Sequence, residues 1–348
     1  MNYDAILVVS FGGPESREDV IPFLENVLRG RNVPRERMLA VAEHYYHFDG
    51  KSPISQQTRE LIAALKTELA DHELEDHGLK LPVYWGNRNW HPMLADTLRQ
   101  MKEDGIQRAL AFVTSAYSSY SGCRQYREDI ARAQAEVGAG APAVDKLRAF
   151  FNHPGFIDAT EDRLRDALDQ VPADARQNLQ IIYVAHSIPI SMANSCDYVR
   201  QLEEVRKLVS ARLGIKNDAL VYQSRSGAPG QPWLEPDILD YLREVKSRNS
   251  ASAVVLAPIS FISDHMEVLY DLDIEARNLC ESLALPMARA KTVGVHPKFI
   301  EMIRELIDER TSGAEPRALG ALGARADVCA LDCCPAPQRP VRPAMRAD

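Results

Sequence analysis

The 348-residue sequence predicts an α/β protein with two doubly wound, Rossmann-like domains, each built on a parallel sheet, and a C-terminal extension that contains cysteines. Three observations support this prediction. The chain is longer than one hydrophobic core usually organises. Apolar strand-like runs alternate with helical patterns. The composition changes to Ala, Gly, Arg and Pro after Thr311, and no amphipathic period continues there.

The first half reads as a series of strand and helix units. Ala5 to Ser10 is a short apolar run typical of a buried strand, and the turn Phe11 to Glu15 leads into a helix. The other elements expected here are strands over 82–85 and 109–115 and helices over 17–28, 61–69, 91–103 and 126–136. We therefore expect a first domain over residues 1–145.

A second series begins after the Gly- and Ala-rich stretch 137–142, which breaks the periodicity. Leu179 to Ala185 and Ala253 to Ile262 are strong apolar strands, with helical patterns between them and on to about Glu309. This predicts a second domain over residues 146–310 and an extension over 311–348. Ligands of doubly wound sheets bind beyond the carboxyl ends of the strands, so the residues after these runs are where chemistry is expected.

Charge and hydropathy exclude several classes of protein. The net charge is -8, with 41 basic against 49 acidic residues, which argues against a nucleic-acid partner. No segment approaches the roughly 20 apolar residues of a membrane-spanning helix. The N-terminal residues lack the basic region of a signal peptide. We expect a cytoplasmic protein, whose cysteines stay reduced unless a metal binds them.

His186 is the first candidate for chemistry, because it directly follows the strand Ile181 to Ala185 and so projects at a carboxyl edge. A neutral imidazole there can accept a proton or bind a metal. The alternative is a packed histidine that is hydrogen-bonded to the backbone.

A row of carboxylates follows the other long strand. Glu267, Asp271 and Glu275 are spaced by four residues, which places them along one face of an α-helix. Their mutual repulsion suggests a path for divalent cations or protons. Alternatively, Asp264 and Glu267 form a helix-capping box and the other acids are solvated. His265 projects away from the Glu267 face of such a helix, so we leave it out of the predicted site.

A resemblance makes these candidates specific. The segments that carry it are Phe11–Glu15, Ser52–Ile54, Tyr84–Arg88, Ala185–Pro189, Gln223–Ser224, Pro232–Asp237 and Ser263–Asp271. Their order along residues 3 to about 308 resembles the ferrochelatases, most closely those of actinobacterial type. Such enzymes insert ferrous iron into a porphyrin, which needs a base for two pyrrole protons and anionic ligands for a cation that sheds its water.

The resemblance also implies roles for individual residues. His186 and Glu267 would be catalytic, as iron ligands and proton acceptors, and Asp271 and Glu275 would line the path of metal or protons. Substrate-binding roles are implied for Ser52, Tyr126, Arg29, Arg31, Phe11 and Trp233. Some members carry a tyrosine at the Phe11 position; phenylalanine can stack on the macrocycle but cannot ligate its iron. The arginines could pair with propionates, or lie at the surface as most arginines do.

The cysteines form a second candidate site. Cys329, Cys333 and Cys334 lie close together in the extension, and Cys123 follows a strand of the first domain. Four thiolates suit a 2Fe-2S cluster or a zinc ion, and a tail with idle thiols is the third reading. The resemblance favours the 2Fe-2S cluster. If the cluster forms, the tail should fold back over the first domain. We expect Cys196 and Cys280 to be isolated and structural.

The expected porphyrin is coproporphyrin III, because residues 31–46 are charged where membrane-acting family members carry an apolar lip. Protoporphyrin IX is the runner-up. Chelation of cobalt or nickel by another tetrapyrrole and a non-enzymatic, cluster-based redox sensor are the remaining alternatives. The resemblance further implies transient contacts with neighbouring haem-pathway enzymes.

Overall fold

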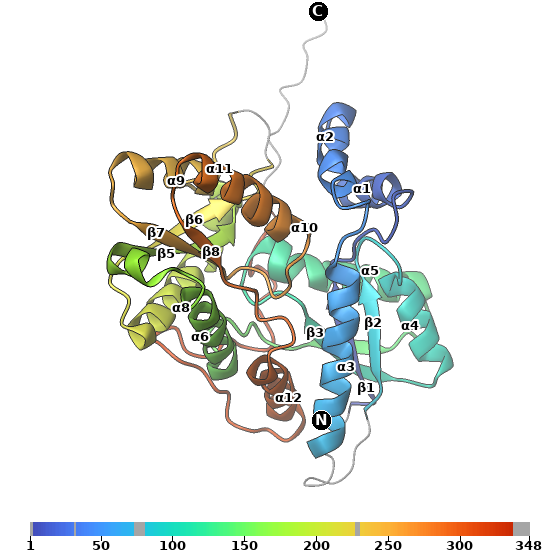
Figure 1. Cartoon of the computed structure of the whole chain (residues 1–348). Coiled ribbons are helices and arrows are strands. Elements are labelled where there is room, and N and C mark those ends of the chain that lie inside the picture. Colours follow the sequence, from blue (N-terminus) through green and yellow to red (C-terminus); the bar gives the residue numbers. More distant parts are fainter. Residues whose placement is uncertain (1–2, 31–32, 73–80, 227–229, 337–348) are drawn as a thin grey trace, which may run out of the picture.

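The computed structural model describes residues 3–30, 33–72, 81–226 and 230–336 and contains two parallel four-stranded sheets (Figure 1). The strands of the first sheet lie in the order β2-β1-β3-β4 and those of the second in the order β6-β5-β7-β8. The two halves therefore repeat one topology, which confirms the predicted fold class. The boundary between residues 145 and 146 stays a prediction.

The first sheet consists of β1 (Ala5–Ser10), β2 (Val83–Asn87), β3 (Arg108–Val113) and β4 (Ala143–Lys146). Its helices are α1 (Val20–Leu28), α2 (Arg35–Tyr46), α3 (Ile54–His72), α4 (Leu94–Glu103) and α5 (Gln125–Val137), with a π-helical turn, η1 (Tyr120–Arg124), before α5. All six residues of β1 are buried, as expected for a strand of a parallel sheet covered on both faces.

The second sheet consists of β5 (Leu179–His186), β6 (Asp218–Gln223), β7 (Ala253–Pro258) and β8 (Met287–Arg289). Its helical elements are α6 (Pro154–Leu168), η2 (Ala173–Asn178), α7 (Ile190–Ala193), α8 (Tyr198–Leu213), α9 (Ile238–Ser247), α10 (Met266–Val268), η3 (Leu269–Ala276), α11 (Arg277–Ser282) and α12 (Pro297–Thr311). Local signals begin several of them: α6 and α12 have proline in their first turn, and the Asp237 side chain accepts from Leu239 N at 2.8 Å to cap α9.

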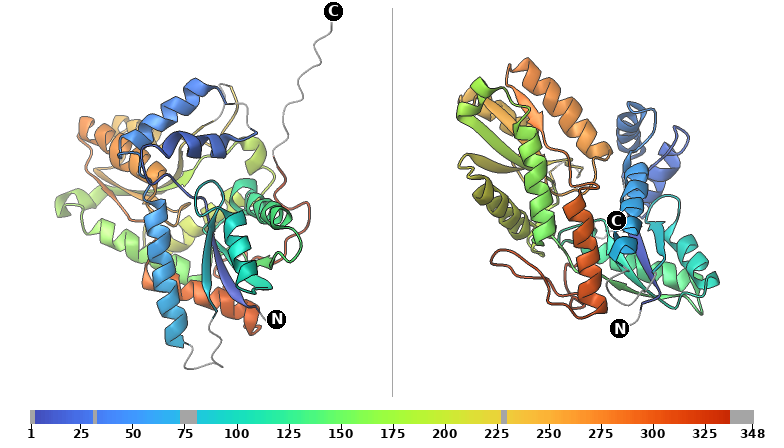
Figure 2. Two further views of the ribbon diagram at one scale, coloured as in Figure 1. Left: turned by 90° about the vertical axis from the view of Figure 1, so that its right-hand side faces the viewer. Right: turned by 60° about the horizontal axis from the view of Figure 1, so that its bottom comes forward.

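One hydrophobic core joins the two halves. Helix α12 packs against α6 and α3 and lies between the halves in the right-hand view of Figure 2. Aromatic rings from β3, α6 and α12 meet there: Phe156 lies 6.2 Å from Phe299 between ring centroids, and Phe112 lies 5.3 Å from Phe150. This packing holds the carboxyl ends of the two sheets in a fixed relation.

The extension from Thr311 to residue 336 is anchored by polar contacts to both halves. Asn152 Nδ2 donates to the Leu319 carbonyl at 3.0 Å, and Glu204 accepts from Leu322 N at 3.1 Å. Farther on, Arg127 on α5 donates to the Cys329 carbonyl at 3.5 Å. The described part of the extension thus crosses from the second half to the first.

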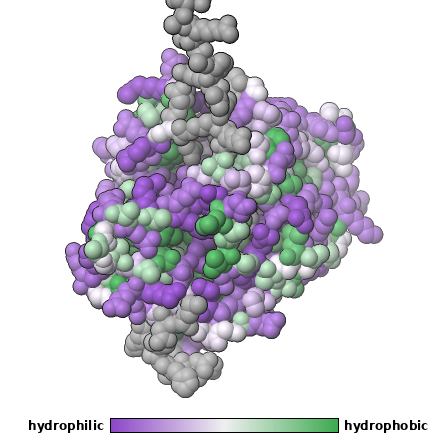
Figure 3. Space-filling model, turned by 180° about the vertical axis from the view of Figure 1, so that it is seen from behind, coloured by the Kyte–Doolittle hydropathy of each residue, from purple (hydrophilic) through white to green (hydrophobic). Residues whose placement is uncertain are grey.

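Seen from behind, the surface is mostly hydrophilic, with apolar side chains in small scattered groups (Figure 3). Within the described ranges, we find no helix with the length and apolar character needed to cross a bilayer.

Candidate active site

His186 and Glu267 form a histidine–carboxylate pair beyond the strands of the second sheet. His186 ends β5, where its backbone N–H donates to Ser260 Oγ at 2.9 Å. Its Nδ1 lies 2.5 Å from the Ser187 carbonyl, which can only accept a hydrogen bond, so Nδ1 carries a proton. Nε2 then faces Glu267 Oε2 at 3.3 Å. Both side chains remain partly open to solvent, with 28% and 42% exposed.

The charges of this pair stabilise each other. Burial lowers the pKa of His186, but the neighbouring Glu267 carboxylate outweighs it and the net pKa is raised. Burial likewise opposes ionisation of Glu267, yet the charge of His186 and a hydrogen bond from it, followed by the charge of His265, bring its pKa down to about 2. Glu267 is therefore an anion at neutral pH, and its charge shifts the equilibrium of His186 toward the protonated form.

Asp271 and Glu275 continue from Glu267, but on a wider helix than the sequence spacing suggested. Residues 269–276 are π-helical, with i→i+5 hydrogen bonds in place of α-helical ones. The pKa of Asp271 is raised to about 7. Burial is the largest cause, and repulsion from Glu267 and Glu275 adds to it. The pKa of Glu275 is raised by burial and then by Asp237. Protons can thus reside on this row near neutral pH.

Two residues at the end of β6 complete the site. Gln223 pairs with His186 in the β5–β6 register, and its Nε2 donates to Asp271 Oδ2 at 3.2 Å. The Ser224 hydroxyl also donates to Asp271 Oδ2. Ser224 has φ of +60°, a left-handed conformation that is uncommon for a residue other than glycine. From the sequence, Gln223 and Ser224 contribute only to the family resemblance, and no individual role is predicted for either.

The capping-box alternative is wrong, because the N-cap of α10 is His265 and not Asp264. His265 Nδ1 accepts from Glu267 N at 3.2 Å, while Asp264 pairs with Arg289 at 2.7 Å. The expectation that His265 projects away from the Glu267 face of a helix is wrong as well, because a cap residue does not project as it would inside a helix. Burial and the charge of His186 lower the pKa of His265.

The first half brings Phe11 and Tyr126 together through Arg88. The Arg88 guanidinium lies 4.4 Å from the Tyr126 ring centroid and 5.7 Å from that of Phe11. Arg88 also forms an ion pair with Asp129, and the two side chains are only 6% and 5% exposed. These side chains make a rigid aromatic and cationic group after β1 and β2.

The other predicted substrate residues are dispersed. Ser52 is buried beside Gly13. A Cβ atom added to Gly13 would lie 2.8 Å from Ser52 Cβ. Arg29 is exposed and hydrogen-bonded to Asn26. Trp233 is buried in the second half, and its indole nitrogen finds no hydrogen-bond partner among the described residues. Arg31 lies outside the described residues.

Helix α2 of the first half meets η3 next to Glu267. The His44 ring stacks on Tyr270 of η3, with centroids 3.8 Å apart and planes 10° from parallel. Met266 belongs to the same hydrophobic cluster as Phe23 and Tyr45 of the first half. Burial and the Glu267 charge raise the pKa of Tyr45. Side chains from both halves therefore lie near the Glu267 carboxylate.

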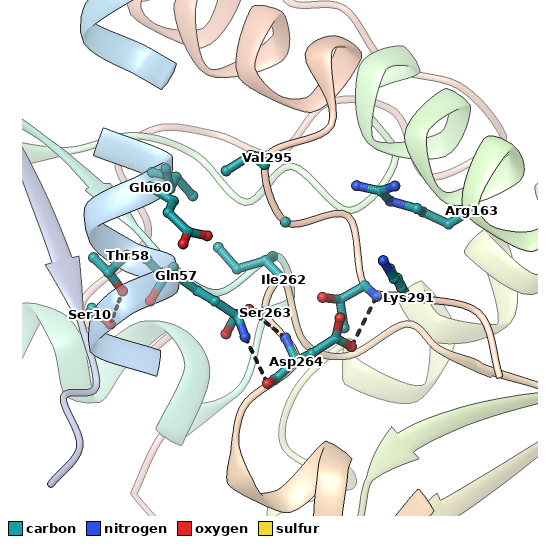
Figure 4. Close-up of a pocket in the computed structure, with 14 residues that line it drawn as sticks. Ser10, Gln57, Thr58, Glu60, Arg163, Ile262, Ser263, Asp264, Lys291 and Val295 are labelled. Carbon is teal, nitrogen blue, oxygen red and sulfur yellow. Dashed lines mark hydrogen bonds between the residues drawn. The ribbon is translucent and has the colours of Figure 1, made fainter. Parts of the chain in front are cut away.

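A separate polar pocket of about 270 Å³ lies between the halves (Figure 4). The Gln57 side chain of α3 forms two hydrogen bonds with the backbone of Asp264. Its Nε2 donates to the Asp264 carbonyl at 2.9 Å, and its Oε1 accepts from the Asp264 N–H at 2.8 Å. Arg163 and Lys291 lie on one side of this pocket and Glu60 on the other (Figure 4). Neither His186 nor Glu267 lines it.

The four cysteines grouped by the sequence lie in one neighbourhood. A hydrogen bond from the buried Cys123 thiol lowers the pKa of Cys329 to about 7, and the Cys333 and Cys334 sulfurs are 3.6 Å apart. In the described ranges, no three His, Cys, Asp or Glu side chains already converge at metal-binding spacing. The expectation that Cys196 is isolated is wrong: it lines a cavity with Cys333 and Cys334. Cys280 is buried in a core of the second half.

Comparisons with known proteins agree on one family. The model of the ferrochelatase family matches residues 3–311. A ferrochelatase of Rhodopirellula baltica is 55% identical, with 97% of this chain and 95% of the relative covered. The coproporphyrin III ferrochelatases of Streptomyces coelicolor and Nocardia farcinica are 50% and 48% identical, covering 98% and 99% of this chain and 95% and 99% of theirs.

Solved structures support the fold. The sirohydrochlorin chelatase SirB of Bacillus subtilis in complex with cobalt is 10% identical, with a TM-score of 0.52 and coverage of 90% of this chain and 97% of SirB. SirB with Fe3+ gives a TM-score of 0.55 at 13% identity, covering 89% and 98%. At this identity the likeness concerns the arrangement of the two sheets alone.

Proposed function

The chain belongs to the ferrochelatase family, and we propose that it inserts ferrous iron into coproporphyrin III, giving coproheme in haem biosynthesis. The observation that carries the proposal is the His186–Glu267 pair at the carboxyl ends of the second sheet, with 3.3 Å between Nε2 and Oε2. Full-length likeness to coproporphyrin III ferrochelatases supports the substrate.

The pKa values suggest a division of labour between the carboxylates. Glu267, with its pKa near 2, holds a proton poorly at neutral pH but offers a negative charge to a divalent cation. In its neutral form His186 takes one pyrrole proton at Nε2, passes it to the carboxylate row, and then takes the second. Asp271, with its pKa near 7, is matched to receive and release that proton. Glu275 continues this path outward, where its side chain is exposed.

The first half would hold the porphyrin. Phe11 and Tyr126 offer apolar ring surface next to the Arg88 cation, and Ser52 lies beside Gly13 in the turn that follows Phe11. Trp233 would wall the site from the second half. Propionates would pair with Arg29 and Arg31, since guanidinium groups match carboxylates.

The outer surface of α2 favours coproporphyrin III over protoporphyrin IX. Helix α2 exposes Arg35, Glu36 and Arg37, and this charged surface would insert poorly into lipid. The tetracarboxylate coproporphyrin does not need to be drawn from a membrane. The free state of all six cysteines supports placement in the reducing cytoplasm.

We also propose a 2Fe-2S cluster between the first half and the extension, held by Cys123, Cys329, Cys333 and Cys334. The contacts between Cys123 and Cys329 and between Cys333 and Cys334 support this set of ligands. The lowered pKa of Cys329 favours its thiolate, whereas the pKa values of Cys123 and Cys334 are raised, so these two thiols would lose their protons only on binding the metal. When bound, such a cluster supplies a one-electron redox centre. Its ligands would tie the extension to α5.

The experiment is anaerobic metallation with ferrous iron, comparing coproporphyrin III with protoporphyrin IX. We expect faster turnover of coproporphyrin III and a loss of at least about 100-fold in His186→Ala, the low end for removing a positioned base. His72→Ala, on the surface at the end of α3, is the matched control and should keep full activity. Turnover of protoporphyrin alone would contradict the substrate, and uptake by neither porphyrin would contradict the activity.

A further inference from the structure

Cys196 is a fifth thiol at the cluster neighbourhood. It lies between α7 and α8, far in sequence from the extension, and lines a cavity of about 360 Å³ with Asp332, Cys333 and Cys334. An ion pair of 2.9 Å between Arg325 and Asp197 joins the two segments beside it. The approach of Cys196 to the extension is therefore built by specific contacts.

The thiols interact as one group. Cys196 interacts electrostatically with both Cys333 and Cys334, and Cys334 also interacts with Cys123. Cys329 contacts both Cys123 and Cys333. Cys280 is different, because it lies in a separate core on α11. Five of the six cysteines thus gather around a site that needs four ligands.

Within the adjacent pair Cys333 and Cys334, one cluster ligand can be exchanged for another thiol most easily. Cys334 is 4% exposed and has φ of +52°, so it points inward from a rare backbone conformation. Cys333 is less buried and lines the cavity that Cys196 also lines. The Cys196 thiol donates to backbone carbonyls, the shorter contact being 3.2 Å to Met192, and accepts a hydrogen bond from the Tyr198 backbone.

We propose that Cys196 is an alternative cluster ligand that can take the coordination position of Cys333. This inference rests on the 2Fe-2S cluster proposed above. Its consequence reaches the active site: Tyr198, two residues after Cys196, donates its hydroxyl to the His186 carbonyl at 3.0 Å. Ligation by Cys196 would connect the cluster directly to the segment that carries His186.

The test uses the full chain purified anaerobically, with iron and acid-labile sulfide measured per chain. Cys333→Ala and Cys196→Ala should each retain about two iron and two sulfide atoms, whereas the double variant should fall to background. Cys280→Ala is the control and should match the unaltered chain. In the reduced state, the electron paramagnetic resonance spectrum should shift in Cys333→Ala and stay unchanged in Cys196→Ala.

The outcomes distinguish a failure of this inference from a failure of the cluster proposal or of the chelatase proposal. Loss of the cluster in Cys333→Ala alone, or its retention in the double variant, would overturn the role of Cys196. A cluster-free unaltered chain would overturn the cluster itself, while metallation of coproporphyrin III would still report the chelatase independently.

Alkylation provides a second measurement that does not depend on folding of the double variant. In Cys333→Ala, iodoacetamide should modify Cys196 only after the cluster iron has been removed with a chelator. Equal modification before and after removal would also reject the proposal.

Discussion

Asp271→Asn should stabilise the protein, and more so at alkaline pH. The ordinary pKa of an aspartate is 3.8, and in the folded chain burial and neighbouring carboxylates raise that of Asp271 to about 7. Between these values the folded state binds a proton that the unfolded chain has released, so the free energy of unfolding falls as pH rises. Each pKa unit corresponds to about 1.4 kcal/mol, so the raised pKa costs about 2 to 3 kcal/mol between pH 5 and pH 8.

Asparagine removes this cost because it is neutral at both pH values. Urea unfolding at pH 5 and pH 8 measures the difference directly: the gain of Asp271→Asn over the unaltered chain should be about 2 to 3 kcal/mol larger at pH 8. Asp240→Asn, a carboxylate 77% exposed on α9, controls for the loss of one charge and should change stability equally at both pH values. An equal gain from Asp271→Asn at pH 5 and pH 8 would refute the assignment of a raised pKa. The variant should also be slower in metallation.

Two further predictions concern neighbouring groups. Glu267→Gln should lower the pKa of His186, because burial then acts without the opposing carboxylate; a pH titration of the imidazole NMR signals checks this, and an unchanged pKa would contradict it. Glu204→Ala should make residues 311–336 more sensitive to limited proteolysis, since it removes the acceptor for Ala321 N and Leu322 N; equal cleavage of the variant and the unaltered chain would argue against this anchor.

The fold could be predicted because its information is local. Apolar runs such as Ala5–Ser10 and Ala253–Pro258 are buried along their whole length, as expected for strands of a parallel sheet covered on both faces. The candidates His186 and Glu267 were found for a related reason, because residues after such strands reach the edge where ligands bind. That the two halves share one strand order is invisible in the sequence, which shows no repeat that would force it.

The rest of the site depends on contacts between distant segments. Ser224 reaches Asp271 only because β6 pairs with β5 in the register that sets Gln223 beside His186. Its position at the end of an apolar strand was the available signal. Cys196 and Cys333 are more than 130 residues apart in the sequence, and they line one cavity only because the extension folds back onto the second half. No local sequence pattern predicts this long-range contact.

Ser224 lies where two uncommon backbone conformations meet, its own left-handed φ of +60° and the π-helix over residues 269–276. Such conformations persist when the surrounding structure fixes them, and they gather at functional sites. Two substitutions separate the backbone cost from the hydroxyl contact. Ser224→Ala loses the hydrogen bond to Asp271 and keeps the strain, whereas Ser224→Gly loses both, so the glycine variant should be more stable than the alanine variant by about 1 to 2 kcal/mol.

The two variants should nevertheless be equally impaired in metallation. Both lack the hydroxyl that lowers the pKa of Asp271, so the pKa of that carboxyl should rise further in each and its proton should be released less readily at neutral pH. Paired urea unfolding and metallation assays distinguish the two effects. Equal stability of the alanine and glycine variants would show that the backbone at Ser224 is unstrained. Full activity in either variant would show that the hydroxyl has no part in proton transfer.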